Sequence, residues 1–356
     1  MHEHAIKYSL TGKSMTELPF VSIIVVNYNS GQYLTNCVRS IMASTYPKKN
    51  LVIVDNASQD HSVEKMLSEF PNVKLIVNRY NLGYAAAGNA GIKSTNDNFI
   101  VVMNPDIFVE STWLEELVKA ADRIPRGAFF QPKILLMDNP RVLNSAGNMI
   151  HIAGFGICRG IGAYDTEEFQ ESEVCYTSGA CMLIRREALQ EIGPLEDLFF
   201  LYGEDKDWGW RALMMGWQSI YVPSSRTLHK WGSSLGETPR KFYLLEFERL
   251  ASISKNYSKR TLLLLMPVIV TVELWVLVYA ALMGWLGEKL QSYVDLFRDR
   301  SLIIERRSVI QKGRVVADRA LVKRFVTRIE HPYLGPAADV LNQLTSRMHR
   351  IVANSI

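Results

Sequence analysis

The feature that most constrains the fold is an alternation of short apolar runs with segments of helical spacing, which begins at Phe20. The runs are rich in β-branched side chains, as in the buried strands of a parallel sheet. They cover residues 21–26, 51–54, 73–77 and 99–103. Helices are expected between them, over 33–42 and 83–92 and from about Ser111, whose hydroxyl suits an N-cap. Repeated β-α-β units of this kind predict an α/β chain with a doubly wound, Rossmann-like sheet.

Polar side chains follow three of these runs, at the points where the strands would end. Asn27 and Asn29 follow the first run, Asp55 closes the second, and Asn104 and Asp106 follow the fourth. In doubly wound sheets, ligands bind beyond the carboxyl ends of the strands. The sequence therefore predicts a binding site at this edge of the sheet.

Two carboxylates at this edge have both a chemical and a structural interpretation. Asp55 can accept the imide N–H of a pyrimidine base, but the residue pattern alone favours an aspartate that caps the turn at residues 56–58. Asp106 follows Pro105, which stiffens the turn, and its carboxylate suits a hard divalent cation. A simple turn is the alternative for Asp106 as well.

An acidic cluster stands at the start of a further predicted helix, where Glu204, Asp205 and Asp207 lie close together. The helix dipole stabilises acidic residues there, but three exceed what capping needs. Attack by a sugar hydroxyl requires a base to take its proton, which a carboxylate at this position can do. Downstream, His229 precedes a Gly-Ser-Ser sequence at 232–234. That sequence suits a loop that binds diphosphate and metal, and equally an ordinary surface segment.

Residues 129–176 are irregular in pattern and contain many glycines. A mobile flap over the site and plain surface loops with hairpins are equally good interpretations. A regular pattern returns with a strand over 180–184 and another around 220–222.

The strongest hydrophobic segment covers residues 261–286 and contains one charge, Glu273, and one proline, Pro267. Its length would allow a membrane span. Three features favour an in-plane or re-entrant membrane association instead: Pro267 should break the helix early, Glu273 is costly in lipid, and both flanks are basic. A true span and a buried or oligomer-forming helix are the alternatives.

The distribution of charge and the cysteine content indicate the partners and the compartment of the chain. The net charge is +4, but basic residues dominate from Lys289 onward. Because that tail follows a hydrophobic run and lacks interleaved aromatic residues, anionic lipid is the expected partner and no nucleic acid is expected. The four cysteines form no C-x-x-C pair, which indicates a reducing compartment, and residues 1–19 contain no continuous apolar stretch typical of a signal peptide.

Taken together, these segments resemble glycosyltransferase family 2, with its GT-A fold, and within it the rhamnosyltransferase-like branch. The resemblance runs across residues 20–235 and is specific because the matches follow the family's order. The matching stretches are 21–30 (VSIIVVNYNS), 54–58 (VDNAS), 78–92 (NRYNLGYAAAGNAGI), 104–107 (NPDI), 178–189 (SGACMLIRREAL), 199–211 (FFLYGEDKDWGWR) and 229–233 (HKWGS). It implies three regions: an N-terminal extension (1–19), a GT-A domain (20–250), and C-terminal hydrophobic or amphipathic helices with a basic tail (251–356).

The resemblance also implies roles for individual residues. Asp205 would be the catalytic base, supported by Glu204, while Asp106 and His229 would hold a divalent cation, Mg²⁺ or Mn²⁺. The family's metal motif usually begins with Asp where this chain has Asn104. The nucleotide pocket would be formed by Asn27, Asn29, Asp55, Gly83 and Asn104. The acceptor side would be formed by Ser178, Gly179, Ala180, Asp207 and Trp208.

The activity implied is that of an inverting transferase that uses a nucleotide diphosphate sugar. The branch suggests dTDP-rhamnose as donor and a lipid-linked or cell-surface glycan as acceptor, at the cytoplasmic side of the membrane, with the protein peripheral or monotopic. A UDP-hexose or UDP-N-acetylhexosamine donor is the alternative within the family. A catalytically inactive nucleotide-sugar-binding scaffold is the alternative of another class. Whether the chain forms a homo-oligomer stays open.

Overall fold

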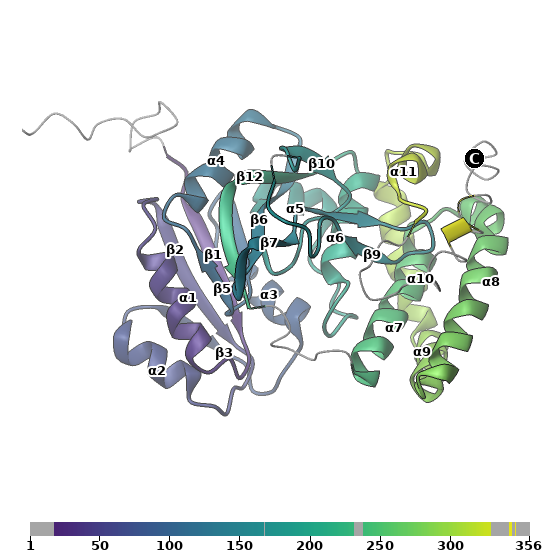
Figure 1. Ribbon diagram of the computed structural model, residues 1–356, viewed down its shortest axis with the longest axis horizontal. Coiled ribbons are helices and arrows are strands. Elements are labelled where there is room, and N and C mark those ends of the chain that lie inside the picture. The colour runs from purple at the N-terminus through teal and green to yellow at the C-terminus, as the bar shows by residue number, and fades with distance from the viewer. Residues whose placement is uncertain (1–17, 167, 231–237, 329–341, 344–345, 347–356) are drawn as a thin grey trace, which may run out of the picture.

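A mixed sheet of ten strands forms the centre of the molecule in the computed structural model, which describes residues 18–166, 168–230, 238–328, 342–343 and 346. Eight strands follow the order β10-β12-β6-β11-β4-β1-β2-β3, while β5 pairs with β12 and β7 with β6. The strands β1 to β4 are mutually parallel where they pair, and β11 runs antiparallel to β4 and β6. Figure 1 shows this sheet with the C-terminal helices gathered at one end of the molecule.

The strands of the sheet, and a separate hairpin of β8 and β9, have the following bounds: β1 Val21–Asn27, β2 Lys49–Asp55, β3 Lys74–Val77, β4 Phe99–Met103, β5 Ile107–Val109, β6 Gly127–Leu136, β7 Asn139–Ser145, β8 Asn148–Ile150, β9 Gly156–Cys158, β10 Ser172–Val174, β11 Cys181–Arg185 and β12 Gln218–His229. The helices are α1 Gln32–Met42, α2 Ser62–Glu69, α3 Tyr84–Lys93, α4 Trp113–Arg123, α5 Arg186–Ile192, α6 Glu204–Met214, α7 Pro239–Asn256, α8 Lys259–Leu282, α9 Leu286–Arg298, α10 Arg300–Gly313 and α11 Asp318–Arg324.

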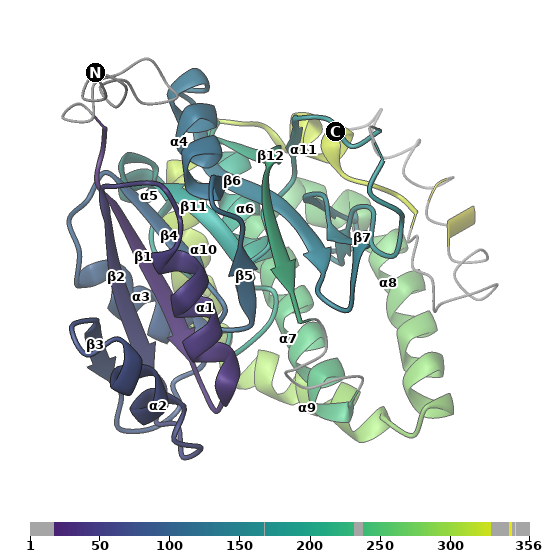
Figure 2. The same ribbon diagram turned by 60° about the vertical axis from the view of Figure 1, so that its left-hand side comes forward.

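Successive residues of the central strands point to opposite faces of the sheet, and each face has its own core. Ile23 belongs to a core with α1, α2 and α4, whereas its neighbour Ile24 belongs to one with α3, α5 and α6. Helices therefore cover both faces (Figure 2), and the predicted doubly wound α/β sheet is confirmed. Cys37 and Cys181 are fully buried in the first of these cores.

Two local expectations for this domain are settled by the structure. The irregular segment 129–176 contains strands and hairpins, including the ten-residue strand β6, so the hairpin interpretation is the better description. The expected N-cap at Ser111 is wrong: the cap position of α4 is Thr112, and the Ser111 carbonyl instead accepts from the Thr45 backbone N–H at 2.9 Å.

Within the described residues, the chain after β12 forms a layer of helices, α7 to α11. The predicted boundary at residue 250 falls inside α7, which begins at Pro239 and packs against α6, α9 and α10. Pro267 was expected to break a helix, yet α8 continues through it. Within the described residues, α8 is the one helix long and apolar enough to cross a membrane by length and composition.

Candidate active site

The carboxyl ends of β1 and β2 bring Asn27 and Asp55 side by side, since these residues are partners in the strand register. Asn27 Nδ2 donates to Asp55 Oδ1 at 2.8 Å. The Asp55 carboxylate also accepts from the Ser58 N–H at 3.0 Å and the Ser58 hydroxyl at 2.6 Å. Both residues are buried. Asp55 thus caps the turn that follows its strand, and its contact with a nucleotide base stays a prediction.

Asn29 and Gly83 shape the loops around this edge. Asn29 has a φ of 47° and is exposed, and its Oδ1 accepts from the Gln59 N–H at 2.8 Å. Gly83 has a φ of 83°, and a Cβ atom there would lie 2.2 Å from the Phe200 carbonyl oxygen. Only glycine allows this approach, which joins the start of α3 to the loop that leads into α6.

Asp106 and His229 meet at the same edge because β5 pairs with the end of β12, with His229 opposite Ile107. His229 Nε2 lies 3.4 Å from Asp106 Oδ1, and both side chains are largely buried. On its other side, His229 Nδ1 lies 3.0 Å from Asn144 Oδ1. An amide oxygen can only accept, so Nδ1 carries the proton and Nε2 faces the Asp106 carboxylate.

These two side chains fit a divalent cation. A carboxylate and an imidazole nitrogen with its lone pair directed at the same point are metal donors, and the Asn144 contact fixes the required tautomer. Within the described ranges no group of three or more His, Cys, Asp or Glu residues could hold a metal ion by itself, so the protein would supply only part of a coordination shell. The Gly-Ser-Ser loop predicted after His229 lies outside the described residues.

The turn Ser178-Gly179-Ala180 connects this pair to the acidic helix. The Asn104 N–H donates to the Ala180 carbonyl at 2.9 Å, which holds the turn against the end of β4. The Ser178 N–H donates to Gln131 Oε1 at 2.6 Å. On its other side, the Gly179 N–H donates to Asp205 Oδ2 at 2.8 Å.

Asp205 lies in the first turn of α6 and is partly exposed. Its other oxygen, Oδ1, accepts from the Lys206 N–H at 2.7 Å. Burial raises the pKa of Asp205, and the hydrogen bond from Gly179 opposes this effect without cancelling it. A carboxylate with a raised pKa is a stronger base, which is the property that proton abstraction requires.

Glu204 is more deeply buried than Asp205, with 5% of its surface exposed. Burial, followed by the neighbouring charge of Asp205, raises the pKa of Glu204 well above its ordinary value. Its Oε2 atom is buried and has no hydrogen-bond partner among the described residues. The two carboxylates therefore compete for protons and titrate as a pair.

The structure does not place Asp207 and Trp208 on the acceptor side. Asp207 is fully buried and pairs with Arg211 at 2.8 Å and Lys255 at 3.2 Å, and these cations hold its pKa well below the ordinary value despite burial. Trp208 is also fully buried and packs against Phe129, with ring centroids 4.9 Å apart. Both side chains are taken up by contacts inside the protein, so neither faces an open site.

Several residues of this site were not expected from the sequence. Tyr84 donates from its hydroxyl to the Gly179 carbonyl at 2.5 Å, and the charges of Glu204, Asp205 and Asp106 all contribute to its raised pKa after burial, the largest cause. Asn144 and Lys206 were also not singled out. No sequence signal marks Asn144, because it reaches His229 only through the sheet pairing. Lys206 lies between the acidic residues of the cluster, and its opposite charge is a sequence signal that could have identified it.

Comparisons with known proteins show the family to which the chain belongs. A model of glycosyl transferase family 2 matches residues 22–193. An N-acetylglucosaminyl-diphospho-decaprenol L-rhamnosyltransferase from Mycobacterium tuberculosis is 31% identical over 240 residues, which cover 61% of this chain and 78% of that protein. The chain belongs to glycosyl transferase family 2. Its similarity to the mycobacterial protein also supports the resemblance to the rhamnosyltransferase-like branch of the family.

A further relative and a solved structure extend the comparison. A low-salt glycan biosynthesis hexosyltransferase from Haloferax volcanii is 27% identical over 207 residues, or 55% of this chain and 62% of that protein. The crystal structure of GalNAc-T7 with UDP, GalNAc and Mn²⁺ aligns with a TM-score of 0.56 at 16% identity, over 72% of this chain and 52% of that one. That likeness supports the GT-A fold of this family 2 glycosyltransferase, and the fold alone.

Proposed function

We propose that this glycosyltransferase is a metal-dependent, inverting enzyme that transfers rhamnose from dTDP-rhamnose to a lipid-linked glycan. The observation that carries the proposal is the position of Asp205. Its partly exposed carboxylate, with a raised pKa, is joined through one short turn to the edge where Asp106 and His229 meet. A base and a candidate cation site on one sheet edge are the parts that a single displacement on a nucleotide sugar needs.

On the donor side, Asp106 and His229 would hold Mg²⁺ or Mn²⁺, with the donor's diphosphate oxygens completing the coordination. The cation would neutralise the negative charge that develops on the departing nucleoside diphosphate. Around it, Asn29, Asp55 and Gly83 would line the nucleotide pocket. The contacts of Asn27 are internal, so its proposed part is to hold Asp55.

On the acceptor side, Asp205 takes the proton of the attacking hydroxyl while Gly179 holds its carboxylate in place. The acceptor oxygen forms a bond to the anomeric carbon as the bond to the diphosphate oxygen breaks. The proton ends on Asp205 and the electron pair leaves with the nucleoside diphosphate. One displacement of this kind inverts the anomeric centre, and the Ser178-Gly179-Ala180 turn would face the acceptor.

The choice of rhamnose and of a lipid-linked acceptor rests on the family relative. The mycobacterial protein is named for transferring L-rhamnose to an N-acetylglucosaminyl-diphospho-decaprenol. A role in cell-surface polysaccharide synthesis follows from the same comparison. The donor alternative is a UDP-hexose or UDP-N-acetylhexosamine.

The deciding experiment measures release of nucleoside diphosphate from dTDP-rhamnose, UDP-glucose and UDP-N-acetylglucosamine, with a polyprenyl-diphospho-N-acetylglucosamine acceptor, with and without Mn²⁺. We expect turnover of dTDP-rhamnose only with metal and a product of inverted configuration by NMR. Asp205→Asn should lose about 10²–10⁴-fold in kcat. Asp197→Asn is the matched control, because Asp197 is exposed and pairs only with Arg306 in the described contacts.

Other outcomes separate the alternatives. Turnover of a UDP-sugar alone would keep the class and change the donor. Metal-dependent donor binding without turnover in any acceptor mixture would favour the inactive scaffold. Full activity of Asp205→Asn would overturn the proposed base.

We also propose that the protein attaches to the cytoplasmic side of a membrane as a monotopic protein through α8 and α9. Two opposite stripes run along α8. One is buried against the protein, and the other is apolar and exposed: Leu263, Met266, Val270, Leu274, Val278 and Leu282. The exposed apolar residues of α9 extend this surface: Leu286, Leu290, Val294 and Phe297. An apolar surface of this length is unusual for water-facing helices.

An in-plane position is favoured over a span because the middle of α8 is tied to the protein. Glu273 accepts from Lys289 Nζ at 2.8 Å and from the Tyr293 hydroxyl at 2.6 Å, and it also pairs with Arg249. A lone spanning helix would leave these charges in lipid without partners.

Flotation with liposomes of phosphatidylglycerol and phosphatidylethanolamine tests the attachment. The full chain should float, and the double variant Leu274→Asn/Leu282→Asn should remain in the pellet. Val77→Asn is the control, since Val77 is exposed on β3 at the opposite end of the molecule (Figure 1). Equal flotation of all three proteins, or none by the wild type, would contradict the proposal.

A further inference from the structure

A buried ion pair lies directly behind the proposed base. Lys206 Nζ is 2.8 Å from Glu248 Oε2, and both side chains are 3% exposed. Lys206 follows Asp205 in α6, whereas Glu248 comes from α7, in the helical layer. The second oxygen of Glu248, Oε1, accepts from the Ser252 hydroxyl at 2.6 Å. The pair therefore joins the first turn of α6 to the middle of α7.

Gly203 shows how closely α7 approaches this turn. It precedes α6 with a φ of 78°, and a Cβ atom added there would lie 2.1 Å from both Cγ and Cδ of Glu248. Any side chain at this position would push Glu248 away from Lys206. The backbone before Glu204 and Asp205 is thus shaped around the α7 carboxylate.

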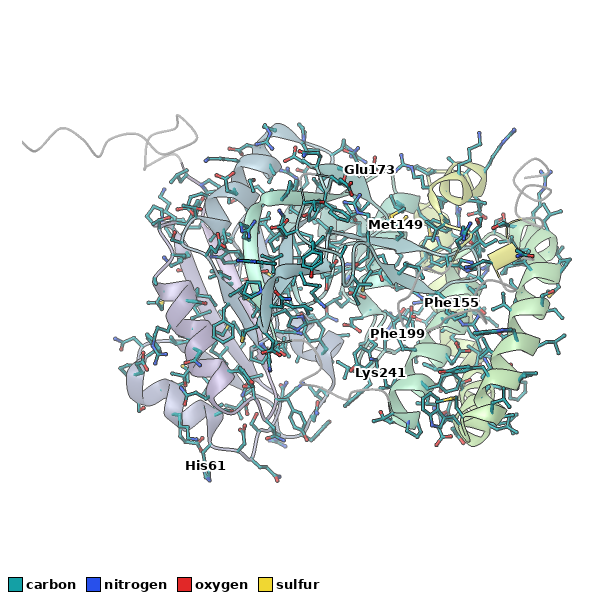
Figure 3. The ribbon with its side chains drawn as sticks, in the orientation of Figure 1. His61, Met149, Phe155, Glu173, Phe199 and Lys241 are labelled. Carbon is teal, nitrogen blue, oxygen red and sulfur yellow. The ribbon has the colours of Figure 1, made fainter. Side chains whose placement is uncertain are left out.

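Lys206 also reaches the segment between β8 and β9, because its ammonium group donates to the Gly154 carbonyl. Gly154 itself has a φ of 86°, and a Cβ atom there would lie 2.7 Å from Ile253 of α7. Three chain segments therefore converge on one ammonium group next to the base. Figure 3 shows Phe155 and Phe199 in this zone, where the sheet domain meets the C-terminal helices.

We propose that Lys206 and Glu248 are positioning residues that hold Asp205 at the site and set its charge state, so that α7 completes the catalytic machinery. This inference rests on the proposed function of Asp205 as the base. Neither residue touches the acceptor in this role: they act through the α6 turn. The helical layer would then serve catalysis as well as membrane attachment.

The charges around Asp205 make the direction of the effect clear. The Lys206 ammonium favours the ionised form of Asp205, while Glu204 shares protons with Asp205. Glu248 raises the pKa of Glu204 through its charge. Asp207 of α6 also acts on Glu248 through its charge. Further titratable groups that interact with these carboxylates or with one another are Tyr84 of α3, Cys158 of β9, Cys175, Tyr176, and Lys241 of α7 through its effect on Cys158.

The test is the pH profile of kcat/KM for the full chain, with whichever donor the panel identifies. Lys206→Met removes the cation, so the acidic limb should move to higher pH by about one unit. Glu248→Gln removes one of three carboxylates that compete for protons, so the limb should move to lower pH. Lys206→Arg should restore the wild-type limb, and the double variant Lys206→Met/Glu248→Gln should lie between the single variants.

Glu246→Gln is the matched control. Glu246 is on the same helix and equally buried, but it pairs with Arg249 and Lys289 on the side of α8 and α9. This variant should leave the limb in place even where it lowers stability. Titration of ¹³C-labelled carboxylates by NMR, with Asp205→Asn to assign the signal, reads the same shifts without turnover.

Opposite shifts for the two single variants support the positioning role, because a purely structural pair would lower activity at every pH without moving the limb. An unmoved limb and unmoved carboxylate signals in both variants would overturn the inference and leave the base intact. Full activity of Asp205→Asn would instead overturn the proposed function itself.

Discussion

Two buried charge clusters that share one turn of α7 differ in the balance of their charges. The outer cluster joins α7, α8 and α9 and contains two carboxylates, Glu246 and Glu273, with two cations, Arg249 and Lys289. The inner cluster joins α6 and α7 and contains three carboxylates, Glu204, Asp205 and Glu248, that interact with one another. Its cation, Lys206, pairs with Glu248 and favours the ionised form of Asp205.

The protonation behaviour of the two clusters follows from this count. In the outer cluster, Arg249 and Lys289 outweigh the cost of burial and lower the pKa of Glu273 to about 2. In the inner cluster, burial raises the pKa of Glu248 to about 7 in spite of Lys206. Burial by itself therefore does not identify a functional carboxylate. A deficit of partner charges does so better, because it leaves a group able to take up a proton near neutral pH.

The largest effect is expected from breaking the balanced cluster. Arg249→Met removes the cation that bonds both Glu246 and Glu273, and it leaves two carboxylates with Lys289 alone. We expect a loss of about 3–5 kcal/mol in the free energy of unfolding, measured in urea. Arg39→Met should cost far less than Arg249→Met, since the Arg39–Glu69 pair is exposed and screened by solvent. Equal losses in the two variants would contradict the distinction.

A smaller loss of stability is expected at Gly203, where α7, the helix that both clusters share, approaches α6. Gly203→Ala places a Cβ atom 2.1 Å from Glu248, in addition to the strain of a φ of 78°. We expect a loss of about 2–4 kcal/mol and a reduced kcat, because α6 and Asp205 must shift. Gly284→Ala isolates the strain: its φ is 73° and nothing lies within 4 Å of the added atom, so about 1–2 kcal/mol is expected. A cost at Gly203 no greater than at Gly284 would show that Glu248 moves freely.

Much of the sheet domain was predictable because its signals are local. The apolar runs of β1, β2 and β4 and the polar residues after them depend only on neighbours in the sequence. The expectations from sequence were wrong where tertiary contacts determine the local structure. Pro267 continues a helix because α8 is held along its length by the protein, and Glu273 is stabilised by Arg249 and Lys289.

The candidate site was predictable from the sequence to a similar extent as the sheet domain. The meeting of Asp106 with His229 is implied by the family resemblance, and the structure brings them to 3.4 Å. Asp207 could not be separated from Asp205 by sequence, since both are acidic residues in one helical turn. Their difference arises from Arg211, which lies four residues after Asp207 in the same helix, and from Lys255, which pairs with Asp207 only once α7 has packed on α6. The same packing brings Glu248 to Lys206, at a separation of 42 residues that no local pattern signals.

The smallest expected effect is on the pH dependence of stability, which should differ between the inner and the outer cluster. The folded-state pKa of Glu248, about 7, lies above the ordinary 4.5, so its stabilising contribution is complete below pH 4.5 and is lost as the pH rises through 7. Glu273, with a folded-state pKa of about 2, contributes above pH 4.5 and loses its contribution only as the pH falls through 2.

Between pH 5 and 8, the wild-type free energy of unfolding should therefore fall by about 2 kcal/mol more than that of Glu248→Gln, in urea titrations at each pH. Glu273→Gln should be less stable than wild type throughout this range, yet keep the wild-type slope, because Glu273 is ionised in the folded and the unfolded chain alike. A Glu248→Gln slope equal to that of the wild type would mean that Lys206 fully compensates Glu248. The inner cluster would then be as balanced as the outer one, and the charge deficit would lie in Glu204 and Asp205 alone.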